Sequence, residues 1–162
     1  MENARDDSAK TRQNGIGTLH IGKKDLPENF LVMNGDVLTD LDFNQFYNNH
    51  VKRGSGFTIG AYNRYDKVEY GVLHKNNKSE LIGFEEKPLN QYLVSMGVYM
   101  MNKKTLKYIP ENKFFGFDSL MSTLIKKDEL PFINEFDGYW LDIGRPDDYE
   151  KAISDNEKKP FN

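Results

Sequence analysis

The sequence predicts an α/β protein, and the alternation of strand and helix patterns between residues 30 and 62 carries that prediction. Phe30 to Met33 form a continuous apolar run closed by Asn34-Gly35-Asp36, the pattern of a strand buried on both faces and ended by a turn. Apolar residues then recur at helical spacing from Phe43 to Val51, and Phe57 to Tyr62 form a second strand-like run. A strand, a helix and a strand in this order favour a right-handed parallel crossover.

The first helix has signals at both of its ends. Asp42 is a candidate N-cap, with Gln45 three residues further on, and Gly54 predicts where the helix stops. The later elements are expected in this order: a hairpin of Tyr70–His74 and Leu81–Glu86, a strand from Val94 to Met101, a helix whose apolar face runs from Phe117 to Ile125, short strands at Phe132–Phe136 and Tyr139–Leu141, and a last helix beginning at Pro146.

Composition excludes several classes of function. The chain has 162 residues, with 22 Lys and Arg against 25 Asp and Glu, and a formal net charge of −3. This length predicts one domain. The slight acidity argues against a nucleic-acid partner, because nucleic-acid binding needs a concentrated basic face. Since the chain has no cysteine, disulfide scaffolds, Cys-ligated zinc and thiol nucleophiles are excluded.

The same patterns predict the setting of the protein. No apolar run approaches the roughly 18 residues of a membrane span, and the N-terminal residues lack the pattern of a signal peptide. We therefore expect a soluble, cytoplasmic protein with no membrane partner. Residues 1–14 contain little that is apolar and are expected to form a disordered leader, which leaves residues 15–162 as the folded domain.

Two carboxylates directly follow apolar, strand-like runs. Asp36 ends the run Leu-Val-Met-Asn-Gly-Asp, and Asp142 ends the run Tyr-Trp-Leu-Asp. Ligands of open α/β sheets lie outside the carboxyl ends of the strands. A hard cation such as Mg²⁺ is held there by one or two carboxylates together with substrate phosphates. The alternative is that each Asp caps a turn, which is common chemistry after a strand.

A second group of candidates lies in and after the predicted hairpin. The Lys87 ammonium suits a phosphate, and the Glu86 carboxylate suits sugar hydroxyls. Because neighbours on a strand point to opposite faces, both serve one site only where the strand bends, at Pro88. The alternative is a solvated strand end. Gly71 permits either a bulge or close approach of a ligand, and Trp140 is expected in the core.

Five short motifs in order carry a family resemblance: FLVMNGDVLTD (30–40), YGV (70–72), FEEKP (84–88), GVY (97–99) and GYWLDIGRPDDY (138–149). Together they resemble the sugar-1-phosphate nucleotidyltransferases, nearest to the branch that includes mannose-1-phosphate guanylyltransferase-like enzymes. The resemblance implies a Rossmann-like fold with a mixed, mostly parallel sheet and flanking helices. It also implies that a sugar-1-phosphate attacks the α-phosphorus of a nucleoside triphosphate and displaces pyrophosphate, giving a nucleotide-sugar.

The resemblance further implies roles for individual residues. It makes Asp36 and Asp142 the Mg²⁺ ligands, and these two are catalytic together with Lys87, which holds the sugar phosphate. Glu86 is expected to hydrogen-bond sugar hydroxyls. Three other positions are implied substrate contacts: Gly71 and Ser95 at the sugar, and Gly17 near the nucleotide base.

One segment of the family pattern is not found. Relatives begin with a strand and a glycine-rich loop whose Arg and Lys wrap the triphosphate, and no such segment precedes Gly15. We therefore expect a sheet that is incomplete on its N-terminal side, with an open edge covered by a second copy or a complementing chain.

Two functions stay open: a Mg²⁺-dependent transferase acting on an NTP and a sugar-1-phosphate, and a catalytically silent, truncated remnant that binds sugar phosphate or a protein partner. The FEEKP and GYWLDIG motifs favour the first over a glycosyltransferase.

Overall fold

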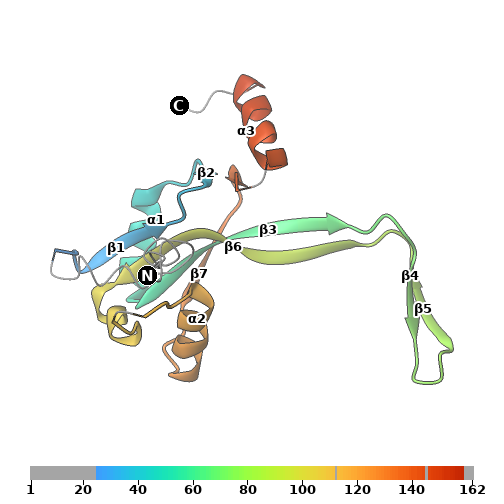
Figure 1. The fold of residues 1–162 in the computed structure, drawn as a ribbon, viewed down its shortest axis with the longest axis horizontal. Coiled ribbons are helices and arrows are strands. Elements are labelled where there is room, and N and C mark those ends of the chain that lie inside the picture. The colour runs from blue at the N-terminus through green and yellow to red at the C-terminus, as the bar shows by residue number, and fades with distance from the viewer. Residues whose placement is uncertain (1–24, 112, 145, 159–162) are drawn as a thin grey trace, which may run out of the picture.

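The computed structural model describes residues 25–158, except for 112 and 145. The expected leader, residues 1–14, and the implied base contact Gly17 lie outside the described residues. No helix in the described part of the chain is both long and apolar enough to cross a membrane. The elements follow in this order (Figure 1): β1 (Asn29–Met33), β2 (Val37–Thr39), α1 (Phe43–Arg53), β3 (Phe57–Lys67), β4 (Val72–Lys75), β5 (Leu81–Glu85), β6 (Leu89–Asn102), the 3₁₀-helix η3 (Lys103–Tyr108), α2 (Phe117–Lys126), β7 (Phe132–Phe136), β8 (Trp140–Asp142) and α3 (Pro146–Lys158).

A four-stranded sheet forms the centre of the molecule, in the order β1-β6-β3-β7 (Figure 1). β6 is antiparallel to both β1 and β3, and β7 is parallel to β3. This confirms the expected α/β class with a mixed sheet. Three of the four strands run in one direction, but only the β3–β7 pairing is parallel, because β6 lies between β1 and β3. The predicted crossover does join β1 to β3 through α1, but β6 lies between the two strands.

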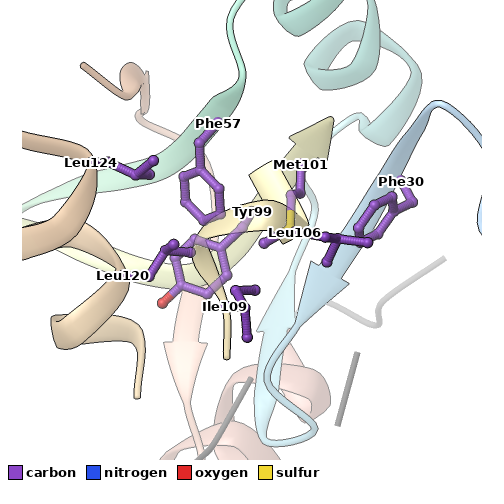
Figure 2. Packing of buried hydrophobic residues seen from close by; sticks show 8 residues of the cluster. All are labelled: Phe30, Phe57, Tyr99, Met101, Leu106, Ile109, Leu120 and Leu124. Carbon is purple, nitrogen blue, oxygen red and sulfur yellow. The ribbon is translucent and has the colours of Figure 1, made fainter. Parts of the chain in front are cut away.

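Side chains of β6 alternate between two hydrophobic clusters, one on each face of the sheet. Tyr99 and Met101 belong to the cluster that η3 and α2 cover (Figure 2). Val98 and Met100 belong to the other cluster, together with Phe46 of α1. Because burying one such side chain stabilises by about 1.5–3 kcal/mol, these two clusters hold the helices against the sheet.

β1 departs from the prediction on one of its two faces. Phe30 is buried, and Val32 packs against the same cluster. Leu31 and Met33, on the opposite face, are 41% and 43% exposed. The prediction of a strand buried on both faces is therefore wrong for β1. The physical reason is that β1 lies at the edge of the sheet and, within the described residues, pairs with β6 alone.

Local signals place α1 as predicted. The Asp42 carboxylate accepts hydrogen bonds from the N–H groups of Asn44 and Gln45, which would otherwise lack partners at the start of the helix. Gly54 ends the helix in the left-handed region, at φ 62°, and its N–H donates to the Val51 carbonyl. The cap and the glycine therefore set the two ends of the crossover helix.

Beyond the sheet, β3 and β6 continue as a two-stranded ribbon that ends in the predicted β4–β5 hairpin (Figure 1). β6 begins at Leu89, earlier than the predicted start at Val94, because Lys67 and Leu89 are still paired at the far end of the ribbon. The segment Leu-Asn-Gln-Tyr-Leu is partly polar, so its sequence does not distinguish a solvated ribbon from a loop.

A buried histidine makes stability depend on pH. His50 is 1% exposed; its Nδ1 and the Thr58 hydroxyl are 2.7 Å apart, and its Nε2 donates to Asn29 Oδ1 at 3.0 Å. Burial lowers the pKa of His50 from its ordinary value of 6.5. The unfolded chain consequently binds a proton more readily than the folded chain does.

We predict that the free energy of unfolding decreases as the pH falls through 6.5 and below, because protonation of His50 favours the unfolded state. Urea denaturation of the wild-type chain and His50→Gln, from neutral pH to about pH 5, measures this. His50→Gln is expected to be less stable at neutral pH and to have a flatter pH dependence. An equal pH dependence in the two proteins would contradict the assignment.

Candidate functional site

A short antiparallel ladder between β2 and β8 brings the two predicted strand-end carboxylates together. Val37 pairs with Asp142, and the Ile143 N–H donates to the Asp36 carbonyl at 2.8 Å. Asp36 and Asp142 are both exposed to solvent. Segments that are far apart in the sequence therefore place one carboxylate each at the same end of a small two-stranded sheet.

Both carboxylates border one small space beside Gly144. A Cβ atom at Gly144 would lie 3.1 Å from Asp142 Oδ1 and 3.2 Å from Asp36 Oδ2. Such contacts are tighter than an ordinary van der Waals distance, so the missing side chain leaves the space between the two carboxylates open. Glycine at this position suits a small cation coordinated from both sides.

The turn interpretation of Asp142 is also realised in the structure. Its Oδ1 accepts a hydrogen bond from the Gly144 N–H at 2.9 Å, which is the expected turn chemistry. The carboxylate has further lone pairs to offer a ligand, so the turn orients Asp142 without occupying it.

In the described part of the chain, no group of three or more acidic or His residues could hold a metal. Two carboxylates with no third protein ligand are the set that Mg²⁺ uses when substrate phosphates complete its coordination. The residues present therefore fit Mg²⁺ and do not form a closed cage.

The second group of predicted residues meets at the base of the hairpin. A Cβ at Gly71 would lie 2.7 Å from Phe84 Cε2 and 3.3 Å from Glu86 Oε2. Only glycine leaves room for the aromatic ring at this point, and the Glu86 carboxylate lies beside the bare backbone. The structure thus brings Gly71 and Glu86 together, and their role as sugar contacts stays a prediction.

The chain bends at Lys87, as a shared site for Glu86 and Lys87 requires. β5 ends at Glu85 and β6 begins at Leu89, so neither residue belongs to a regular strand. Lys87 has φ 46°, a left-handed conformation that is uncommon outside glycine and often found at functional positions. Its side chain is exposed, as that of Glu86 is.

Ser95 lies on β6 and takes part in local hydrogen bonds. Its hydroxyl donates to Tyr99 Oη at 3.1 Å and accepts from the Gly97 N–H at 3.3 Å. Burial raises the pKa of Tyr99, partly offset by the hydrogen bond from Ser95. The two hydroxyls therefore remain neutral partners, and the bonds that the structure records for Ser95 are structural.

The predicted site is divided into two parts in this structure. The β2–β8 ladder, which Asp36 borders and Asp142 ends, lies beside the central sheet. Gly71, Glu86 and Lys87 flank the β4–β5 hairpin, which follows the far end of the β3–β6 ribbon (Figure 1). The described part of the structure does not bring these two groups together. Sequence reasoning also missed Gly144, whose lack of a side chain leaves the space between the two carboxylates open. Its place in the Asp-Ile-Gly run that begins at Asp142 was a usable signal.

A cavity of about 440 Å³ opens elsewhere, at the other end of β1, beside Asn29 and His50. Polar groups in its wall already have protein partners: both His50 nitrogens are bonded, and the Thr105 hydroxyl donates to the Gly56 carbonyl at 2.7 Å. Because these polar groups already form hydrogen bonds within the protein, they offer few free donors or acceptors to a ligand. This cavity is therefore not the candidate site.

Comparisons with known proteins agree with the motifs. A family model described as nucleotidyl transferase matches residues 2–159. The chain is 33% identical over 141 residues to a mannose-1-phosphate guanyltransferase from Aspergillus fumigatus, covering 80% of the chain and 36% of that relative. It is 29% identical over 141 residues to a glucose-1-phosphate adenylyltransferase from Halalkalibacterium halodurans, covering 80% of the chain and 37% of that relative.

A solved structure extends the agreement to the fold. The crystal structure of HddC from Yersinia pseudotuberculosis superimposes with a TM-score of 0.62 at 25% identity, covering 89% of this chain and 64% of HddC. The chain spans about a third of the length of the two curated relatives. The family match over residues 2–159 confirms the resemblance drawn from the motifs, and the chain belongs to the nucleotidyl transferase family, among the relatives of the sugar-1-phosphate nucleotidyltransferases.

Proposed function

We propose that the chain acts as a cytoplasmic, Mg²⁺-dependent sugar-1-phosphate nucleotidyltransferase, which transfers a nucleotidyl group from an NTP to a sugar-1-phosphate. The proposal rests on one observation: the Asp36 and Asp142 carboxylates both border the space beside Gly144. The chain that holds them belongs to the nucleotidyl transferase family. Two independent lines, the strand-end placement and the family motifs, assign the same two carboxylates.

The reaction is a displacement at phosphorus. A phosphate oxygen of the sugar-1-phosphate forms a bond to the α-phosphorus, the bond from that phosphorus to the bridging β-phosphate oxygen breaks, and pyrophosphate leaves with the electron pair. Little covalent chemistry falls to the protein, so its contribution is positioning and charge stabilisation. Mg²⁺, when bound, neutralises charge that develops on the phosphoryl oxygens; Asp36 and Asp142 would hold it.

The hairpin residues supply the sugar end of the proposal. Lys87 is a point charge suited to the sugar phosphate, and the Glu86 carboxylate accepts hydrogen bonds from hydroxyls beside the Gly71 backbone. Lys87 lies between the end of β5 and the start of β6, next to the last pair of the ribbon, Lys67 and Leu89. The proposal therefore requires the β3–β6 ribbon to bend until Lys87 and the carboxylate pair reach one substrate. A two-stranded ribbon without a third strand is the part of this fold that is least able to hold a fixed shape.

The relatives guide the choice of substrates. They are a guanyltransferase for mannose-1-phosphate and an adenylyltransferase for glucose-1-phosphate. We therefore propose a hexose-1-phosphate and a purine nucleoside triphosphate for this chain, with GTP and mannose-1-phosphate as the first pair, following the motif resemblance.

We predict that the purified chain releases pyrophosphate when it is given Mg²⁺, a purine NTP and a hexose-1-phosphate. Asp142→Asn should lower the rate about 100-fold, the cost of removing one electrostatic contact to the transition state. Lys87→Met should mainly raise the KM for the sugar phosphate. A coupled pyrophosphate assay across NTP and sugar-1-phosphate pairs measures both effects.

Asp128→Asn is the matched control for the loss of one carboxylate. Asp128 has φ 58°, a conformation that Asn tolerates, and it lies after α2. It should keep the wild-type rate. Absence of pyrophosphate release from a chain shown by circular dichroism to be folded would favour the silent remnant that binds sugar phosphate or a partner.

Metal binding can be tested without turnover. We predict that Mn²⁺, used as a paramagnetic probe for the Mg²⁺ site, binds the wild-type chain, and that Asp36→Asn weakens it by more than the roughly 10-fold expected for loss of an outer-shell group. Gly144→Ala should also weaken binding, because its Cβ would crowd both carboxylates. Electron paramagnetic resonance titrations give the affinities, and unchanged affinity in Asp36→Asn would contradict the metal site.

We also propose that a second copy of the chain covers the flank of the sheet beyond β1, which is open within the described residues. Leu31 and Met33 are half exposed on β1, and α1 presents Phe43, Tyr47 and Val51 as a second partly exposed stripe. The strand Asn-Phe-Leu-Val-Met carries no charge or proline that would oppose pairing with its own copy.

Light scattering on the purified chain should therefore give twice the monomer mass of 18.8 kDa. Leu31→Lys should return it to the monomer mass, because a charge at the edge opposes strand pairing. A monomeric wild-type chain would contradict this proposal and leave a complementing chain of different sequence as the alternative.

A further inference from the structure

A bulge in β6 lies between the two segments that carry the carboxylates. Along the β3–β6 ladder, Ile59 pairs with Tyr99 and Ala61 pairs with Ser95. Two steps along β3 therefore correspond to four along β6, so β6 bulges at this point, and the bulge includes Met96 and Gly97. Both are buried, so their carbonyl groups need hydrogen-bond donors from elsewhere in the protein.

The first donor comes from the turn that carries Asp36. The Asn34 N–H donates to the Gly97 carbonyl at 2.8 Å. Gly97 has φ 73°, and a Cβ there would lie 2.7 Å from Asn34 Nδ2. Glycine is therefore required twice, for the backbone conformation and for the close approach of Asn34. This contact seats the Asn34-Gly35-Asp36 turn on the bulge.

The second donor comes from the strand that carries Asp142. The Trp140 indole Nε1–H donates to the Met96 carbonyl at 2.9 Å. The indole also lies against the Tyr62 ring, with centroids 5.3 Å apart and planes tilted by 42°. Trp140 is the first residue of β8 and Asp142 is the last, so one side-chain hydrogen bond ties this three-residue strand to the central sheet.

We propose that this bulge sets the separation between Asp36 and Asp142, and that Trp140 is a positioning residue for the metal site. The inference rests on the proposed function. Adjacent carbonyls of one bulge hold the two carboxylate-bearing segments, one through Asn34 and the other through Trp140. The β2–β8 ladder pairs only three residues on each strand, and so short a two-stranded ladder does not keep a fixed position by itself.

Trp140→Phe separates the hydrogen bond from the packing. The phenyl ring keeps an aromatic contact with Tyr62, but it has no N–H, so the Met96 carbonyl loses its donor. β8 stays paired with β2 and bonded to the Asp36 carbonyl, but this small ladder loses its hydrogen bond to the bulge and can shift against the Asn34 end of the Asp36 turn. Both carboxylates and the net charge are unchanged. We expect the affinity for Mn²⁺ to fall about 10-fold, as for removal of an outer-shell partner of a metal ligand.

The control is a substitution that lowers stability without touching the bulge. Leu124 is 2% exposed in the cluster on the opposite face of the sheet, and Leu124→Val disturbs that cluster alone. It should unfold at a lower urea concentration than the wild-type chain and bind Mn²⁺ with unchanged affinity. Gly97→Ala is the second variant at the bulge, and it should weaken Mn²⁺ binding by displacing the Asn34 turn.

The experiment titrates Mn²⁺ by electron paramagnetic resonance into the full chain and the variants Trp140→Phe, Gly97→Ala, Leu124→Val and Asp36→Asn, each checked for folding by circular dichroism. Weaker binding in Trp140→Phe and Gly97→Ala, with none lost in Leu124→Val, supports the inference. Wild-type affinity in Trp140→Phe and Gly97→Ala, beside weakened binding in Asp36→Asn, would overturn the positioning role and leave the proposed function standing. Equal losses in Trp140→Phe and Leu124→Val would also overturn it. A wild-type chain that does not bind Mn²⁺ would overturn the metal site itself, and this inference with it.

Discussion

Two neighbouring backbone carbonyls, those of Met96 and Gly97, impose the constraint on which the arrangement of this protein depends. A buried carbonyl without a donor costs about 1–3 kcal/mol, and both residues lie in the bulge of β6, where the regular pairing with β3 is interrupted. The Asn34 N–H and the Trp140 indole satisfy them. The small β2–β8 sheet is therefore attached to the central sheet by polar contacts of fixed geometry, in addition to apolar packing that tolerates sliding.

This attachment connects the core to the chemistry. The clusters on the two faces of the sheet bury the part of β6 from Met96 to Met101, with Val98 and Met101 fully inaccessible to solvent. The segments that carry Asp36 and Asp142 are hydrogen-bonded to this buried part of β6 through Asn34 and Trp140. A site for a metal or a substrate needs such support from a rigid element. The hairpin residues have the opposite surroundings, since Gly71, Glu86 and Lys87 lie on an exposed two-stranded ribbon. The fold thus combines a well-packed end that carries the two carboxylates with a less restrained end that carries Lys87.

Much of the candidate site could be predicted from sequence because its residues mark the ends of elements. Asp36 and Asp142 follow apolar runs, and the general rule for α/β sheets places such residues at one edge. Strand alternation alone would have separated them: Asp142 pairs with Val37, so Asp36, the next residue, belongs to the other face of a regular ladder. The structure brings them together because the Gly144 N–H holds the Asp142 carboxylate in a turn, and no spacing rule reports such a contact. Trp140 was expected in the core; it packs against the cluster around Met96, and its indole nitrogen donates to the Met96 carbonyl, a contact that its sequence position did not indicate.

The sequence by itself determined the α/β class, the caps of α1 at Asp42 and Gly54, the hairpin, and the identity of the candidate residues, because each of these depends on local backbone preference or on hydrophobic period. Only the tertiary structure decided that β6 lies between β1 and β3 and that one face of β1 is partly exposed. It also decided that the Gly97 carbonyl accepts a hydrogen bond from the Asn34 N–H and the Met96 carbonyl accepts one from the Trp140 indole. These features depend on register and on contacts between residues distant in the chain. Such contacts are set by the free energy of packing the whole molecule, so no short window of sequence contains them.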